Sequence, residues 1–118
     1  VWVRTATSDS VLFAGRKYEG GSDYVPGGWD CGPGFGEITF YDAQDLAARA
    51  ARKRKPWKIV PYATWRPEEM WDSRREFGGM AHDAANGYLY VVERYAGPDG
   101  TAIVHVYRMV SEAPSVEP

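Results

Sequence analysis

The sequence has little of what several protein classes require. Its single cysteine, Cys31, excludes an internal disulfide, and no stretch approaches the roughly 18 consecutive apolar residues of a membrane-spanning helix. The 14 Lys and Arg residues are nearly balanced by 16 Asp and Glu residues, so the basic excess typical of nucleic-acid-binding proteins is missing. From these shortages we expect no nucleic-acid partner, no membrane partner and no cofactor.

The chain also lacks an initiator methionine and the pattern of a signal peptide. It starts at Val1 within an apolar alternation, and we therefore expect a processed product or a C-terminal fragment of a larger protein. Its 118 residues are 44% hydrophobic and 14% aromatic, which is enough for one domain with a buried core.

Short strands dominate the pattern. Residues 10–15 and 37–41 are rich in β-branched and aromatic side chains, and residues 57–65 alternate in character, with Pro61 favouring a sheet edge or a bulge. Three further strands are predicted at residues 79–83, 88–93 and 102–108, with turns at 83–87 and 97–100. The sequence therefore predicts an all-β fold of antiparallel meanders.

One short helix interrupts the strands. Asp42 or Asp45 can cap its start, residues 46–51 favour helix, and Pro56 ends it. Leu46 is its only large apolar residue, which predicts a surface position. We interpret the basic residues at its end as a solvated helix terminus that favours the helix dipole, and not as a nucleic-acid site: Arg49, Arg52, Lys53, Arg54 and Lys55.

The chain contains an internal repeat. The aligned segments are residues 11–20 with 88–97 and residues 38–41 with 103–106. Leu12 then falls on Leu89 and Gly20 on Gly97, and each half continues into a second strand. Two copies of one meander are typical of β-propeller blades.

Residues 79–83 (Gly-Met-Ala-His-Asp), followed by Gly-Tyr-Leu-Tyr-Val at 87–91, resemble the opening of a blade in NHL-like, SMP-30-like and kelch-like β-propellers. The resemblance implies one partial propeller-like domain over residues 1–118. Its parts are a first blade-like repeat at 1–66 with a long insertion at 20–36, a second at 67–110, and a flexible tail at 111–118. Because propellers close with four to eight blades, the implied partners are missing blades of the same protein.

Residues 41–46 and 55–57 are similar to the C-terminal part of large uncharacterised bacterial proteins of the exported kind. This resemblance implies an extracytoplasmic or secreted location.

The insertion at residues 20–36 is the first candidate site. Seven of its seventeen residues are glycine, yet it also holds Tyr24 and Trp29, whose rings suit stacking on a carbohydrate or another small molecule. Asp30 could accept hydrogen bonds from hydroxyl groups of that ligand. In the alternative interpretation, Trp29 and Phe35 pack the loop against the sheet.

His82 and Asp83 are the second candidate site, because an inner propeller strand would point them at a central channel. In the alternative interpretation, Asp83 accepts N–H groups of its own turn and His82 faces a neighbouring strand. Two adjacent residues are too few ligands for a metal, so we expect no metal site. The spacing of Cys31 from His82 and from His105 does not favour a nucleophile–base pair, and we assign no catalytic residue.

These observations predict a scaffold or ligand-binding module. The alternative is part of a propeller enzyme, a hydrolase or lyase acting on carbohydrate, in which Asp30, His82 and Asp83 share one channel. A self-associating structural protein would follow if open sheet edges pair between copies.

Overall fold

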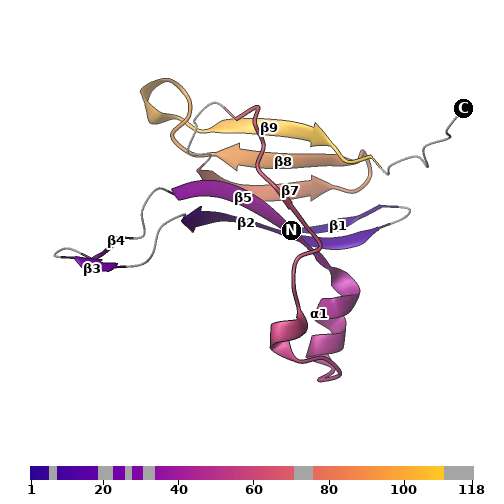
Figure 1. The fold of residues 1–118 in the computed structure, drawn as a ribbon. Coiled ribbons are helices and arrows are strands. Elements are labelled where there is room, and N and C mark those ends of the chain that lie inside the picture. Colours follow the sequence, from indigo (N-terminus) through magenta and orange to yellow (C-terminus); the bar gives the residue numbers. More distant parts are fainter. Residues whose placement is uncertain (6–7, 19–22, 26–27, 31–33, 71–75, 111–118) are drawn as a thin grey trace, which may run out of the picture.

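The computed structural model describes residues 1–5, 8–18, 23–25, 28–30, 34–70 and 76–110. In these residues the chain forms two larger antiparallel sheets, one two-stranded ribbon and one α-helix (Figure 1). The predicted fold class, all-β with one short surface helix, is therefore confirmed. The sequence expectations for Cys31 and for the tail at 111–118 lie outside the described residues.

The first sheet has the strand order β1-β2-β5-β6. Its strands are β1 (Trp2–Arg4), β2 (Asp9–Tyr18), β5 (Gly34–Asp42) and β6 (Ala63–Trp65). Both β2 and β5 extend beyond their predicted ranges, because their pairing runs unbroken from Ser10 opposite Asp42 to Tyr18 opposite Gly34. The first residues of the chain add β1 along the other side of β2.

The strand predicted at residues 57–65 is correct only at its end. Residues Pro56–Lys58 form a 3-10 helix, η1, and only Ala63–Trp65 pair as β6. Pro56 starts η1 at a position where its missing N–H is not needed, and Pro61 cannot donate to a ladder. As expected from Pro61, β6 lies at an edge of its sheet.

The second sheet is a meander of β7 (Phe77–Asp83), β8 (Tyr88–Glu93) and β9 (Ile103–Arg108). The three predicted strands are confirmed. In the turn between β7 and β8, Gly87 has a φ of 74° and donates its N–H to the Asp83 carbonyl at 2.8 Å. The turn between β8 and β9 contains the 3-10 helix η2 (Pro98–Gly100).

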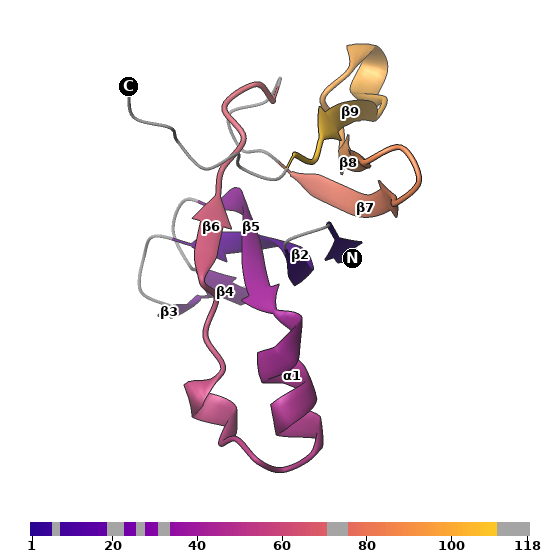
Figure 2. The same ribbon diagram turned by 90° about the vertical axis from the view of Figure 1, so that its right-hand side faces the viewer.

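The helix α1 (Ala43–Ala50) follows β5 directly, and its N-cap is Asp42, whose carboxylate accepts the N–H of Gln44 at 2.8 Å. None of its residues is buried, as predicted for a surface helix. Together with η1 it projects away from both sheets (Figures 1 and 2).

The core lies where the two sheets meet, and β7 contacts β2 there (Figure 1). Its buried apolar residues come from both sheets and from the connection between them: Val3, Leu12, Ile38, Met70, Leu89 and Val91. Leu12 and Leu89, which the repeat aligns, are both buried. Leu12 lies opposite Phe40 in the first sheet, and Leu89 lies opposite Tyr107 in the second, so Phe40 corresponds to Tyr107. The predicted alignment placed Phe40 on His105 instead. The second strands are therefore shifted by two residues from that alignment.

Candidate functional site

The predicted ligand-binding residues of the insertion lie on the two-stranded ribbon of β3 (Asp23–Val25) and β4 (Gly28–Asp30). Its backbone register places Tyr24 opposite Trp29, and Asp23 opposite Asp30. The side chains of these residues are outside the described part of the structure. Stacking of a ligand on Tyr24 and Trp29, with Asp30 as acceptor, stays a prediction.

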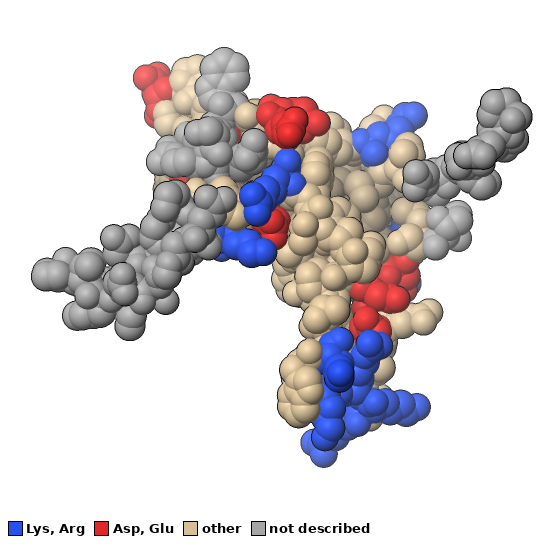
Figure 3. All heavy atoms as spheres, viewed as in Figure 1, with Lys and Arg blue, Asp and Glu red and all other residues tan. Residues whose placement is uncertain are grey.

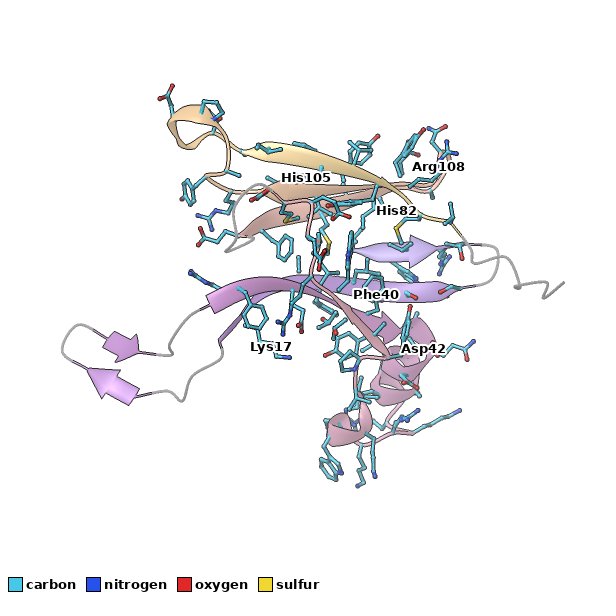
Figure 4. The ribbon with its side chains drawn as sticks, turned by 45° about the horizontal axis from the view of Figure 1, so that its top comes forward. Lys17, Phe40, Asp42, His82, His105 and Arg108 are labelled. Atoms are coloured by element: carbon cyan, nitrogen blue, oxygen red, sulfur yellow. The ribbon has the colours of Figure 1, made fainter. Side chains whose placement is uncertain are left out.

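His82 and Asp83 do not share a site, because successive residues of a strand point to opposite faces. His82 pairs with the buried Leu89 and lies on the side of β7 that faces the core (Figure 4). Its Nε2 atom is buried and has no hydrogen-bond partner among the described residues. Asp83 lies on the opposite side of the strand, so the shared channel expected for the two residues is not formed by them.

Asp83 instead organises the turn that follows β7. Its carboxylate accepts the backbone N–H groups of Ala85 and Asn86 at 3.1 and 3.2 Å, and the Asn86 side-chain amide at 2.8 Å. The hydrogen bond from the Asn86 side chain, followed by that from its backbone, lowers the pKa of Asp83. The interpretation of Asp83 as a turn-capping residue is confirmed.

A pair of ionisable residues that the sequence pattern did not predict lies on the inner face of the second sheet. Glu93 is fully buried, and its Oε1 lies 2.7 Å from Nε2 of His105 on the neighbouring strand. The signal was present in β8, since Glu93 continues the buried alternation of Leu89 and Val91. An acidic residue at such a position needs a polar partner inside the protein.

Tyr107 completes this inner cluster. Its ring stacks on His105 with centroids 6.3 Å apart and meets Trp65 of β6 edge-on at 4.7 Å. Its hydroxyl is buried without a hydrogen-bond partner among the described residues, and burial, with smaller contributions from Glu69 and Glu93, raises its pKa. Glu93 has no exposed surface, so a substrate cannot reach its carboxylate unless the sheets move. We therefore interpret the Glu93–His105–Tyr107 cluster as part of the packing between the two sheets.

The opposite, outer face of the second sheet is open. The strand register gathers six apolar or aromatic side chains there, which we call the outer face: Ala81, Tyr88, Tyr90, Val92, Val104 and Val106. Val104 and Val106 are each 56% exposed. Among the described residues, charged side chains lie at the ends of this face: Asp83 and Arg108 flank Tyr88 in the register at one end, and Arg94 lies beside Gly78 and Val92 at the other. A three-stranded sheet thus presents apolar side chains on both of its faces.

The outer side of the first sheet combines an aromatic pair with a buried carboxylate. Phe13 is 54% exposed and meets Tyr41 edge-on at 5.6 Å. Beside it is a shallow hollow of about 180 Å³ that includes Lys17 and Glu37 in its lining. Glu37 accepts hydrogen bonds from Arg66 Nε at 2.9 Å and Lys17 Nζ at 3.2 Å, and the Arg66 bond is the main reason that its pKa is lowered.

In the described ranges, no group of three His, Cys, Asp or Glu side chains is placed to hold a metal ion. None of the helices in that part of the chain is long and apolar enough to cross a membrane. Across the whole sequence and structure, no protein-family model, no curated protein and no solved structure matches this chain.

Proposed function

We propose that this chain is a β-propeller-like scaffold or binding module that packs the outer face of its second sheet against another antiparallel sheet. The observation that carries the proposal is the outer face itself, where Val104 and Val106 are more than half exposed. An antiparallel sheet with one solvated face normally places polar side chains on that face. Here the inward positions of β9 hold Ile103, His105 and Tyr107, while Val104 and Val106 point outward.

Another sheet is the occupant that this surface suits best. The outer face is formed by regular strands whose alternating residues make a pleated apolar surface, and sheets pack on such surfaces at about 10 Å through interdigitating side chains. Adjacent blades of a propeller, or two copies of this chain, would supply that second sheet. In both cases, burial of the apolar outer face would stabilise the contact between the sheets by about 25 cal/mol per Å² of apolar surface removed from water.

An enzyme acting on carbohydrate is the second candidate, and the Glu93–His105 distance of 2.7 Å is the observation that favours it. A carboxylate beside an imidazole can hold or move a proton. The complete burial of Glu93 favours the scaffold instead. Release of nitrophenol from nitrophenyl glycosides by the wild-type chain, lost in Glu93→Gln, would support the enzyme.

Sedimentation velocity over a concentration series tests the scaffold proposal. We expect the wild-type chain to self-associate through its outer face, and a Val104→Lys/Val106→Lys double variant to sediment as a monomer. The matched control is Ala84→Lys/Ala85→Lys, which adds the same two charges to an exposed turn of the same sheet. A wild-type chain that stays monomeric at every concentration contradicts pairing between copies, and a control that dissociates equally contradicts the role of the outer face.

A further inference from the structure

The charges of this nearly neutral chain are separated along the sequence. Residues 46–67 contain seven of the 14 Lys and Arg residues and none of the 16 Asp and Glu residues. Six of these cations lie in the projecting segment formed by α1, η1 and their connection, which we call the basic arm and define as residues 43–60. Figure 3 shows Lys and Arg side chains gathered at the end of this arm.

The backbone brings the cations together at the end of α1. Arg52 has a φ of 58°, and its N–H reaches the Arg49 carbonyl at 2.9 Å, while the N–H of Lys53 reaches the Ala48 carbonyl at 2.8 Å. This pair of hydrogen bonds is a Schellman motif, which ends the helix and reverses the chain beside it. The result is an open hollow of about 250 Å³ lined by Arg49, Arg52, Lys53, Arg54 and Lys55.

Helix stability alone does not account for so many cations. The C-terminus of a helix carries about half a negative charge, which one or two basic residues offset. Arg54 also has a partner, Asp45, at 2.5 Å. Among the described side chains we find no acidic partner for the others, which are Arg49, Arg52, Lys53, Lys55 and Lys58. Like charges held this close repel one another, and an external anion would relieve that repulsion.

An exposed aromatic residue sits among these cations. Trp57 is 71% exposed, and Lys55 Nζ lies 5.8 Å from its ring centroid. Val60, which follows on the same arm, is 59% exposed. Tryptophan beside lysine and arginine is typical of segments that rest in the head-group region of a bilayer.

We propose that the basic arm docks on a membrane surface rich in anionic phospholipid. The cations contact lipid phosphate and carboxylate groups, and Trp57 enters the interface. A projecting tip suits a broad anionic surface, whereas single-stranded nucleic acid is bound in grooves that stack several bases on aromatic rings. The exposed ring described at this tip is Trp57, and the one acidic residue of the arm, Asp45, is paired with Arg54.

Co-sedimentation with vesicles tests the proposal. We expect the wild-type chain to pellet with vesicles of phosphatidylcholine and phosphatidylserine, and not with phosphatidylcholine alone. Because each basic residue near an anionic surface contributes about 1 kcal/mol, Lys53→Gln/Lys55→Gln should lower the partition coefficient about 30-fold. The matched control Arg94→Gln/Arg108→Gln, which removes two exposed charges from the second sheet, should change it less than about threefold. Trp57→Ala should weaken binding while leaving its salt dependence unchanged.

Several results would overturn the proposal. These are equal binding to both kinds of vesicle, an equal loss in the control variant, or no binding to the anionic vesicles. Tighter binding to a single-stranded oligonucleotide than to the anionic vesicles would identify a nucleic-acid site instead. Release from the vesicles by inorganic phosphate beyond the effect of chloride at equal ionic strength would identify a small-anion pocket. Self-association of the chain does not bear on this test, because the basic arm and the outer face are separate surfaces.

Discussion

The buried pair Glu93–His105 gives the sharpest test of what stabilises the inner face of the second sheet. Glu93 has no exposed surface, and His105 Nε2 lies 2.7 Å from its carboxylate. Replacing His105 by leucine preserves the apolar packing but removes this hydrogen bond from a buried carboxylate. Removing the hydrogen-bond partner of a buried carboxylate destabilises a protein by about 3–5 kcal/mol, a large part of the 5–15 kcal/mol that holds a typical domain folded. At roughly 4 °C per kcal/mol, the unfolding temperature should fall by about 12–20 °C.

The double variant Glu93→Leu/His105→Leu separates the pair from ordinary packing. An apolar replacement of both partners leaves no buried charge, so its stability should return to within about 2 kcal/mol of the wild type. Urea unfolding followed by tryptophan fluorescence measures the free energy of unfolding of the wild type and of each variant. His82→Leu is the matched control on a neighbouring strand, and because its buried Nε2 lacks a partner among the described residues, it should be neutral or slightly stabilising. If His105→Leu unfolds at the same urea concentration as the wild type, the pair does not stabilise the second sheet and the reasoning is refuted.

Two further predictions concern the backbone and acid stability. Arg52 and Gly87 both have positive φ, at 58° and 74°, so Arg52→Gly should raise the free energy of unfolding by about 0.5–1 kcal/mol and Gly87→Ala should lower it by about 1 kcal/mol. Both changes are measured by urea unfolding, and the same sign for both would contradict the strain argument. Glu37 has a lowered pKa in the folded state, so it stabilises the fold above its unfolded pKa of about 4.3 and loses that contribution as the pH falls through the folded value. The difference in stability between wild type and Glu37→Gln should therefore be constant above about pH 5 and shrink in more acidic solution, and an increase on acidification would contradict the role of Arg66.

Local chemistry made most of the elements predictable. The turn at residues 83–87 needed a residue that tolerates positive φ, and Gly87 supplies it. The Asp42 carboxylate caps α1 by accepting the N–H of Gln44, as its residue type predicts. The alternation of β8 places Leu89 and Val91 in the core. The exception is residues 57–65, where Pro61, together with Pro56 just before the range, limits pairing to the last three residues.

The candidate sites were harder to foresee, because a site depends on which faces meet. His82 and Asp83 are neighbours in the sequence but lie on opposite sides of β7. Glu93 and His105 are 12 positions apart and are joined only by the pairing of β8 with β9. Neither relationship is visible until the strand register and the side of the sheet are known.

The sequence by itself determined the strand content, the turns, the surface position of the helix and the clustering of basic residues between positions 49 and 58. These features arise from φ/ψ preferences and from the side-chain period, which act over a few residues. Only the tertiary structure decided that the second sheet buries Glu93 and leaves Val104 and Val106 exposed, and that the basic arm projects away from both sheets. Those outcomes depend on which surfaces pack together, because burial is set by contacts between segments that are distant in the chain.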